Sequence, residues 1–277
     1  MTIFQNLALI VTIAHTGMRE GNMKTKFLLL ITFALALIIG IGLFAITKPS
    51  NNVVSVSKES FKEETSEYNI NIEYPQISGL KNVPLQNVLN EKFKPNLENI
   101  RMSVLDYREV YRNLSAEQLE GVGKSEEKKT FETRFASQNL ISISFEHSGY
   151  DGSSAHGGQR ASVINYDLTT GKEIQLKDLF KKDSKYLQTI SDFYLNDLAS
   201  RFEGNDNIPG WPQPQIGAAP EENNFTNFVL TKDDLVILFN PYQVAPGAYG
   251  IQEIKIPYAN LSNIINQKVL LNGLLHE

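Results

Sequence analysis

Residues 225–261 read FTNFVLTKDDLVILFNPYQVAPGAYGIQEIKIPYANL, and this stretch decides the fold because no other part of the chain is patterned as regularly. Three short runs rich in β-branched and aromatic residues follow one another, separated first by a tight turn and then by a wide loop. They predict a three-stranded unit. The predicted strands are Phe225–Leu230, Leu235–Phe239 and Ile251–Ile256, the turn is Thr231–Asp234, the loop is Asn240–Gly250, and a short helix follows at Tyr258–Ile265.

Upstream of this unit, apolar spacing of three and four residues predicts helices. Asn82–Leu114 keeps that spacing, and Pro95 should kink it or divide it into two helices. Asp183 is placed to cap a second helical segment that runs to about Phe202. The charged, glycine-containing segment 115–129 is expected to be a loop.

Alternating apolar and polar residues predict further strands, and Pro75 is expected to end the first of them. Strands and helices follow one another without a regular βαβ order, which favours an α+β fold built from antiparallel hairpins with two or three packed helices. We expect residues 68–180 to form one half of this unit and 181–270 the other. The remaining predicted strands are Tyr68–Tyr74, Phe131–Phe135, Leu140–Phe145 and Ala161–Leu168.

Phe27–Ile46 is a run of 20 residues without a charge, which is the length that a membrane-spanning helix needs. Lys24 and Lys26 precede it, so the short segment 1–26 is expected to stay in the cytoplasm and the rest to be exported. Met23 begins a complete export signal, and residues 1–22 are expected to be an upstream extension. Residues 47–67 are polar and predict a linker between this single-pass signal-anchor and a periplasmic or extracellular domain.

The exported part is acidic, with 22 basic and 30 acidic residues and a formal charge of −8. A nucleic-acid partner needs a basic face, so this class of partner is excluded. The chain has no cysteine, which excludes disulfides and cysteine-based chemistry or metal sites. Histidine is too scarce for a histidine-rich metal site, and no cofactor motif is present, so we expect neither a metal nor a cofactor.

The glycine-rich loop Gly149–Gly158 holds Asp151 and His156, the one pair in the chain that suggests a catalytic or ligand-contacting site. The competing interpretation is structural: the glycines shape the backbone and His156 bonds to it, and we favour this interpretation. Ser153 and Ser154 lie beside His156, but no G-x-S-x-G elbow surrounds them. A hydrolase therefore remains an alternative rather than the prediction.

Three aromatic residues fall in predicted loops: Trp211 in the proline-rich loop Asn205–Asn224, and Tyr242 and Tyr249 in the loop Asn240–Gly250. Loop aromatics can stack on sugars or anchor a protein partner, and they can equally seal a sheet edge. The candidate binding residues are Asp151, His156, Trp211, Tyr242 and Tyr249.

Three motifs give the chain a family resemblance: NFVLTKDDLVILFNPYQVAPGAYGIQEIKIPYANL at 227–261, SGYDGSSAHGG at 148–158 and NYDLTTGKEIQLKDLF at 165–180. Together they resemble a bacterial envelope family over roughly residues 67–265. Its domains form the extracellular part of lysozyme-sensing anti-sigma-V factors and precede the catalytic domain in some peptidoglycan deacetylases. The resemblance implies a domain of unknown function with no shared catalytic chemistry.

The chain departs from both kinds of relative. At most 26 residues precede the apolar run, where an anti-sigma factor needs a cytoplasmic domain, and the sequence ends at Glu277, where a deacetylase needs a further metal-binding catalytic domain. We therefore expect a recognition unit on an anchor, a non-enzymatic envelope protein. Its ligand by resemblance is a lysozyme-like protein or a cell-wall glycan such as peptidoglycan. The alternatives are an envelope hydrolase that uses the Asp151–His156 loop and a structural scaffold for other envelope proteins.

Overall fold

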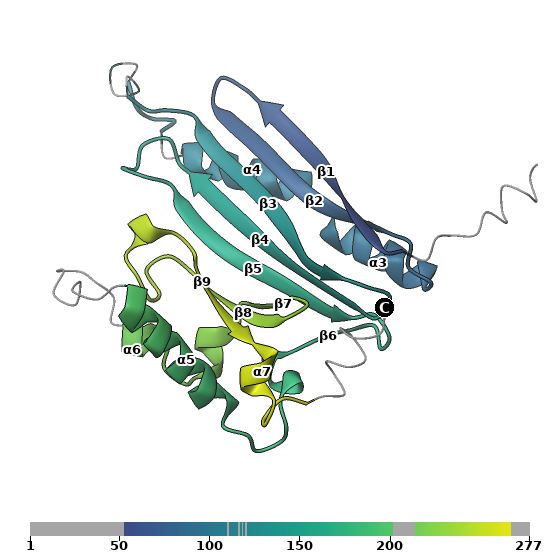
Figure 1. The fold of residues 1–277 in the computed structure, drawn as a ribbon. Helices are drawn as coiled ribbons and strands as arrows, with labels where there is room; N and C mark the ends of the chain where they lie inside the picture. The colour runs from purple at the N-terminus through teal and green to yellow at the C-terminus, as the bar shows by residue number, and fades with distance from the viewer. Residues whose placement is uncertain are drawn as a thin grey trace, which may run out of the picture. The chain divides into compact units, whose positions relative to one another are not determined.

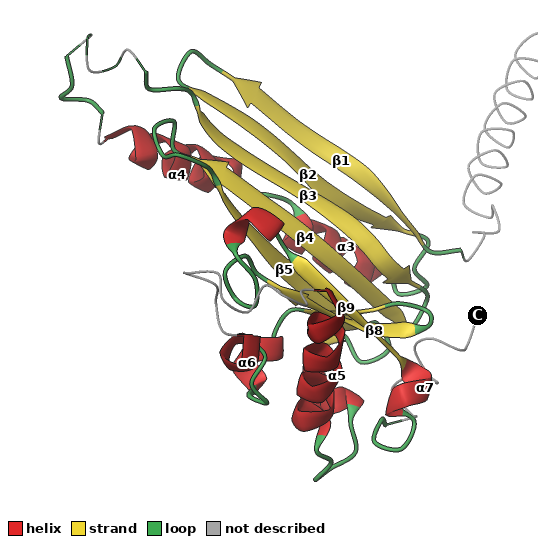
Figure 2. Ribbon diagram, turned by 60° about the vertical axis from the view of Figure 1, so that its left-hand side comes forward, coloured by secondary structure: helices red, strands yellow, loops and turns green. Residues whose placement is uncertain are grey.

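The computed structural model describes residues 53–109, 111–115, 117, 119, 121–201 and 214–266, all within the compact unit Asn52–Glu277. These residues form two sheets flanked by helices (Figures 1 and 2). The fold is therefore α+β. The larger sheet has the order β1-β2-β3-β4-β5-β6 and the smaller one the order β7-β8-β9. The large-sheet strands are β1 Ser55–Glu64, β2 Tyr68–Ser78, β3 Ser125–Ala136, β4 Leu140–Tyr150, β5 Gly158–Asp167 and β6 Lys172–Glu173.

One pair of neighbours in the large sheet departs from the predicted antiparallel arrangement. β2 and β3 run parallel, from Tyr68 opposite Ser125 to Ile72 opposite Lys129. Parallel neighbours need a long connection, and here it contains helices α3 Val83–Phe93 and α4 Leu97–Glu109. The expectation of purely antiparallel hairpins is corrected by this crossover, while the predicted hairpin of β3 and β4 is confirmed.

Three local predictions were wrong because polar or proline-containing strands resemble loops and linkers in sequence. Ser55–Glu64 is β1 and not part of a linker, and Ser125–Lys129 belongs to β3 and not to a loop. β2 also continues through Pro75 to Ser78. β3 pairs with β2 only as far as Ile72, so Pro75 has a strand on one side only and its missing N–H breaks no ladder there.

The division of the helical segment at Pro95 is confirmed, because α3 ends at Phe93 and α4 begins at Leu97. Leu89 and Phe93 of α3 are buried against the sheet, whereas Val88 is exposed. The amide of Asn90, also buried, bonds both backbone groups of Ile77, accepting from its N–H at 2.7 Å and donating to its carbonyl at 2.9 Å. Asn90 thus serves as the partner that β2 lacks beyond Ile72.

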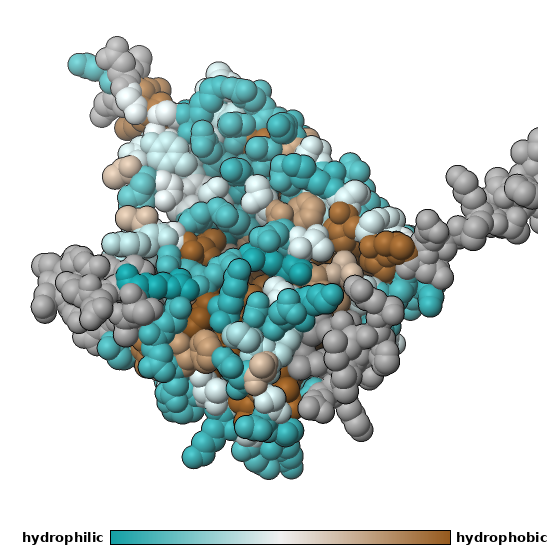
Figure 3. Space-filling view, viewed as in Figure 1, coloured by the Kyte–Doolittle hydropathy of each residue, from teal (hydrophilic) through white to brown (hydrophobic). Residues whose placement is uncertain are grey.

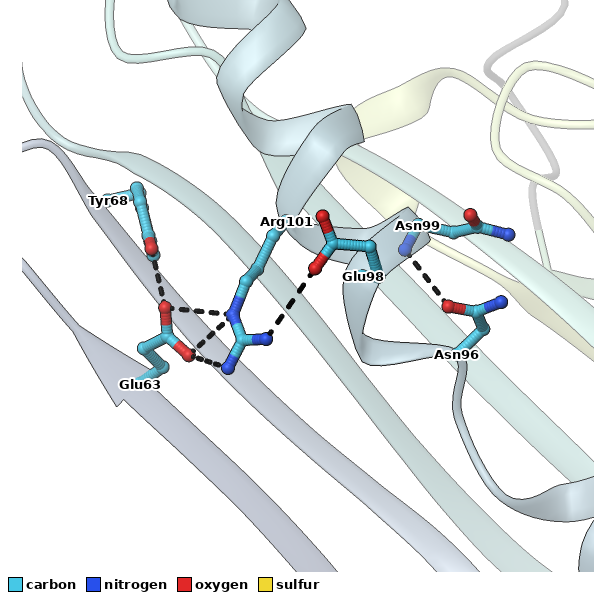
Figure 4. Close-up of polar contacts among 6 residues, drawn as sticks. All are labelled: Glu63, Tyr68, Asn96, Glu98, Asn99 and Arg101. Carbon is cyan, nitrogen blue, oxygen red and sulfur yellow. Dashed lines mark hydrogen bonds and ion pairs between the residues drawn. The ribbon is translucent and has the colours of Figure 1, made fainter.

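Helix α4 is tied to the β1–β2 hairpin by one cluster of polar side chains (Figure 4). The guanidinium of Arg101 donates to Glu63 through Nε at 2.8 Å and Nη2 at 2.5 Å, and the Tyr68 hydroxyl donates to the same carboxylate at 2.5 Å. These bonds lower the pKa of Glu63, with the Arg101 bond as the larger cause. Because charge-assisted forked bonds fix geometry, they hold edge strand β1 in register with the helix.

The small sheet is the most deeply buried part of the molecule. Its strands are β7 Phe228–Leu230, β8 Asp234–Phe239 and β9 Gln252–Pro257, and α7 Tyr258–Leu261 follows. Alternate residues of β8 face two cores. Leu235, Ile237 and Phe239 pack with α5 Tyr186–Arg201, while Val236 and Leu238 pack with Ala161 of β5. The predicted three-strand unit is confirmed, and α6 Pro214–Gly217 lies in the same region.

A buried polar network joins the two sheets. The Ser142 hydroxyl donates to Asn165 Oδ1 at 2.6 Å and accepts from the N–H of Leu230 at 2.9 Å. Asn165 Nδ2 then donates to the carbonyl of Phe228 at 2.7 Å. β7 is therefore bonded, through two side chains, to β4 and β5. The face of the large sheet on which this happens is called the C-terminal face below, and the face under α3 and α4 is the helix face.

The predicted anchor Phe27–Ile46 lies outside the described residues. Within the ranges that the structure describes, no helix has both the length and the apolar character needed to cross a membrane.

Candidate functional site

The candidate site lies where the β4–β5 hairpin meets the loop after β8. At this end of the large sheet Gly149 stands opposite Gly158, and a Cβ added at Gly157 would lie 2.7 Å from the carbonyl oxygen of Gly149. The glycines therefore allow close backbone approach and leave a row of the sheet without side chains. The side chains missing at Gly149 and Gly158 would stand on the helix face, beside Glu127. On the C-terminal face Ser148 and Gln159 stand opposite each other and form the floor of the site.

The loop Asn240–Gly250 forms a wall beside this floor because its base is fixed by side-chain bonds. Asn240 Oδ1 accepts from the N–H of Ala161 on β5 at 2.7 Å. Gln243 Nε2 donates to the carbonyls of Gly217 at 3.0 Å and Asn224 at 2.9 Å. The loop is thus held to β5 on one side and to the end of α6 and the segment after it on the other, so its tip can present side chains with little ordering cost.

Between floor and wall lies a groove of about 840 Å³. Tyr242 lines it with 60% of its surface exposed, and its backbone has φ of +67°. That conformation is costly for an aromatic residue, and such strain is concentrated at functional sites. Gly247 makes room for the ring, because a Cβ there would lie 2.2 Å from the ring atom Cζ of Tyr242. The groove lining includes Glu126, Lys128, Ser148, Gln159, Tyr242 and Ala248.

The surface around this region is mostly hydrophilic in the view of Figure 3, and hydrophobic residues gather there only in small patches. Tyr249 is 48% exposed on the same loop but does not line the groove. Of the predicted aromatic anchors, Tyr242 and Tyr249 therefore share one loop, and Trp211 lies outside the described residues.

Asp151 and His156 lie in the same loop but are not joined to each other. Asp151 accepts bonds from the N–H groups of Ser153 and Ser154, each at 2.8 Å, and from the Ser154 hydroxyl at 2.6 Å. These bonds, led by the Ser154 hydroxyl, lower the pKa of Asp151 to about 2. His156 is exposed and bonds through Nδ1 to the carbonyl of Gly157 at 3.0 Å. Both side chains are engaged locally, as the structural interpretation predicts.

The helix face of the same hairpin carries a second cavity, of about 510 Å³, lined by Glu127, His147 and Arg160 among others. Burial lowers the pKa of His147 to about 4, helped by the nearby charges of Lys129 and Arg160, and Nε2 of His147 lies 3.2 Å from the Ser162 hydroxyl. Burial also raises the pKa of Glu127 and lowers that of Lys129. Sequence reasoning missed this cluster because the strand residues 125–129 were expected to form a loop.

Among the residues that the structure describes, no three histidine, aspartate or glutamate side chains gather closely enough to hold a metal ion. The arrangement on the C-terminal face is suited to binding, since it offers a shallow floor, mixed hydrogen-bonding groups and an aromatic wall. Sequence reasoning found the wall but missed the floor residues Glu126, Lys128 and Gln159. The sequence did offer one indication for Gln159, which directly follows Gly157 and Gly158 at the end of the glycine-rich loop.

Two family models match the chain. Residues 61–159 match the family described as deacetylase PdaC, and residues 177–259 match a protein family of unknown function, DUF3298. The chain is 26% identical over 219 residues to the anti-sigma-V factor RsiV of Bacillus subtilis (strain 168), covering 77% of this chain and 71% of RsiV. It thus carries a PdaC domain and a DUF3298 domain and is homologous to RsiV, as the resemblance predicted. The predicted boundary between residues 180 and 181 stays a prediction.

Two further proteins are similar to parts of the chain. The peptidoglycan-N-acetylmuramic acid deacetylase PdaC of the same strain is 29% identical over 133 residues, which cover 48% of this chain and 28% of that protein. The crystal structure of a DUF3298 family member from Bacteroides fragilis NCTC 9343 superposes with a TM-score of 0.58 at 19% identity. It covers 79% of this chain and 97% of the other. This second similarity supports the fold alone.

Proposed function

We propose, from the joined PdaC and DUF3298 domains and the homology to an anti-sigma-V factor, that this chain is a membrane-anchored envelope receptor. Its exported domain binds a lysozyme-like protein without chemical turnover. The observation that carries the proposal is the match to RsiV over 71% of that protein's length, which spans both domains of this chain. The uncharged run Phe27–Ile46 with Lys24 and Lys26 before it supports the anchor and its orientation.

The surface that supports recognition is the loop Asn240–Gly250. Tyr242 and Tyr249 are exposed on it, and its base is bonded to Ala161, Gly217 and Asn224. Exposed aromatics on a rigid support are typical anchors of protein interfaces. The acidic charge of the exported part suits a basic partner, because opposite net charges accelerate the encounter. Trp211, in the segment that the sequence predicts to be a proline-rich loop, is a further proposed anchor.

The hydrolase alternative lacks geometric support at the Asp151–His156 loop. The carboxylate of Asp151 is bonded to Ser153 and Ser154, and the imidazole of His156 is bonded to a backbone carbonyl. A general base must reach the nucleophile or a partner that orients it, and these two groups do neither for each other. The scaffold alternative predicts co-purification with envelope proteins and no saturable binding of a lysozyme.

The test is titration calorimetry of the full chain in detergent micelles with a basic lysozyme at low and high salt. We expect saturable binding that weakens as salt rises, since screening reduces charge attraction. Replacing Tyr249 or Trp211 with alanine should each cost about 2 kcal/mol of binding if the side chain is a central anchor. A heat of binding that neither substitution changes would place the interface elsewhere, and no binding at either salt would overturn the proposal.

Topology has its own test. A reporter that is active only after export should work when fused after residue 60, because the lysine-flanked run orients the chain outwards. A cytoplasmic reporter that is active at the same position would contradict the proposed orientation. Deletion of residues 1–22 should leave export unchanged.

A further inference from the structure

The cavity on the helix face of the large sheet has a floor that is made of two glycines. Gly149 of β4 and Gly158 of β5 stand opposite each other, and a Cβ added at Gly158 would meet no atom within 4 Å. The cavity, of about 510 Å³, occupies the space that these two side chains leave. Ser103 of α4, the helix behind this end of the sheet in Figure 1, lines one side of it. A cavity of this volume can hold a small organic ligand.

The end wall of the cavity is the glycine-rich loop, from which Asp151 and His156 line it. The loop is held in place by its backbone. The N–H of Gly123 donates to the carbonyl of Gly152 at 2.7 Å, and the Ser125 hydroxyl donates to the carbonyl of Asp151 at 2.8 Å. Residue 152 has to be glycine, because its φ is +98° and a Cβ there would lie 2.5 Å from the carbonyl oxygen of Gly123. The wall is therefore fixed before any ligand arrives.

Two side chains of opposite charge flank the glycine pair. Glu127 of β3 stands opposite Gly149, and its Oε2 lies 3.3 Å from the place of a Cβ on that glycine, so the carboxylate reaches over the floor. Arg160 of β5 is exposed and lies two residues beyond Gly158 on the same face. Strand spacing of about 4.8 Å and a rise of about 3.3 Å per residue put the Cα atoms of Glu127 and Arg160 roughly 12 Å apart. Among the described residues, neither side chain has a hydrogen bond or an ion pair.

The half-buried carboxylate of Glu127 is the group that most needs a partner. Burial raises its pKa, and the charges of Arg160 and Lys129 only oppose that shift from a distance. Withdrawing a carboxylate from water without giving it a hydrogen bond costs stability. A cationic group of a ligand, placed on Glu127, would recover that cost.

The charges that line the cavity exclude the simpler kinds of ligand. A ligand with only negative charge would meet the carboxylates of Glu127 and Asp151. A ligand with only positive charge would meet Arg160, and Lys129 stands in the same row of the sheet, across His147. An apolar ligand would cover Glu127 and leave its carboxylate without a bond. The lining therefore suits a ligand that carries both charges.

An amino acid carries both charges on one carbon. Its ammonium can donate to the carboxylate of Glu127, while its carboxylate accepts a forked pair of bonds from the guanidinium of Arg160. Both protein side chains are long, so the gap that the ligand has to bridge is shorter than the separation of the Cα atoms. We propose that the helix-face cavity binds a free amino acid as its zwitterion, with the ammonium on Glu127 and the carboxylate on Arg160.

The experiment screens the full chain in detergent micelles against each common α-amino acid by saturation-transfer NMR, and then titrates the tightest binder by calorimetry. The N-acetyl derivative of that amino acid lacks the ammonium, and its amide lacks the carboxylate. We expect saturable binding of at least one amino acid, and binding of each derivative that is weaker by about tenfold or more, because each loses one charged hydrogen-bonding group. Saturable binding of no amino acid, or equal binding of either derivative, would overturn the proposal.

Variants place the binding within the cavity. Glu127→Gln and Arg160→Gln each remove one charge and should weaken amino-acid binding by about tenfold or more. Glu126→Gln is the matched control, since the same change one residue earlier on β3 falls on the opposite face, and it should alter the affinity by less than about twofold. Gly158→Val fills the floor where a Cβ meets no atom, so it should block binding and keep the melting temperature. Unchanged affinity in Glu127→Gln, Arg160→Gln or Gly158→Val would overturn the proposal.

The amino-acid site and the proposed lysozyme interface are tested independently. No residue of the loop Asn240–Gly250 lines this cavity, so Glu127→Gln and Arg160→Gln should both keep saturable lysozyme binding. A parent protein that binds lysozyme and no amino acid would remove only the amino-acid site. A parent protein that binds an amino acid and no lysozyme would remove only the protein interface.

Discussion

Strand β8 and strand β1 differ in nearly every respect that makes a strand recognisable. All five residues Leu235–Phe239 of β8 are buried, while no residue of β1 is fully buried. β8 lies between two cores, whereas β1 is an edge strand that pairs only with β2 within the described residues. The difference teaches that the small sheet is the rigid support of the molecule and that the outer part of the large sheet is a polar platform.

This contrast explains why the candidate site lies where a loop of the buried small sheet meets the polar face of the large sheet. The loop Asn240–Gly250 follows β8, the most deeply buried strand, and leads into β9, so both of its ends are fixed by the small sheet. It overhangs the C-terminal face of β3–β5, which keeps polar groups because the small sheet does not cover that end of it. Recognition residues on loops positioned by a rigid scaffold are a common arrangement.

The largest expected effect tests the claim that the small sheet is the support. Phe239→Ala removes a fully buried ring that packs against Tyr194 and Phe225, and it should destabilise the fold by about 3–5 kcal/mol. Phe61→Ala on β1 removes a half-buried ring and should cost about 1 kcal/mol, roughly half of what full burial contributes. Chemical denaturation gives the free energy of unfolding of both variants. Equal losses of stability in the two would contradict the claim that the small sheet is the rigid support.

A smaller effect is expected at the junction of the two sheets. Asn165→Ala leaves the buried carbonyl of Phe228 without its donor and should cost about 1–3 kcal/mol. Asn69→Ala on β2 is the control, because it makes no such cross-sheet bond and should change stability by less than about 0.5 kcal/mol. The denaturant midpoints of the two variants measure this difference in stability. An Asn165→Ala variant as stable as Asn69→Ala would show that the polar network does not hold β7 against the large sheet.

The helix face of the large sheet should give a pH dependence that the apolar small-sheet core does not. The pKa of His147 is lowered to about 4, below the roughly 6.5 of an exposed imidazole. Between pH 4 and about 6.5, the unfolded chain binds a proton at His147 that the folded chain does not. The free energy of unfolding is therefore unaffected by this histidine above about pH 6.5, and it decreases as the pH falls from there towards 4.

His147→Gln should remove that slope from melting curves recorded between pH 7 and 4. The difference between the two proteins isolates the histidine from Glu127, whose raised pKa acts in the opposite sense. Parallel curves for the variant and the parent protein would contradict the lowered pKa.

The smallest effect is expected at His156. Its imidazole is exposed and bonds only to the neighbouring carbonyl of Gly157 among the described residues, so His156→Ala should change stability by about 0.5 kcal/mol or less. Hydrolysis of a cell-wall substrate that disappears in this variant, with an unchanged melting temperature, would instead favour the hydrolase.

The sequence was informative where burial is two-sided and uninformative where a strand is polar. The continuous apolar run LVILF identified β8, and Pro95 located the break between α3 and α4. Alternation is weak in SVSKESFKEE, so β1 was predicted to be a linker. Parallel pairing of β2 with β3 could not be inferred, because it depends on where a long crossover returns and not on local pattern.

The candidate site was predictable only in part for a related reason. Tyr242 and Tyr249 were visible as aromatics among proline and glycine, and the glycine-rich loop was visible as such. The contact of Asn240 with Ala161, which brings that loop to β5, joins residues 79 positions apart. The floor residues Glu126 and Lys128 fell in a segment whose charges suggested solvent exposure, although a polar sheet face also produces that pattern.

The most direct test of the central claim is hydrogen–deuterium exchange of the full chain with and without a saturating basic lysozyme. The account predicts added protection in the loop Asn240–Gly250 and in the adjoining turn of residues 149–158, with β1 and α3 unchanged. Protection confined to β1 or α3, or no change in the loop at saturation, would contradict it.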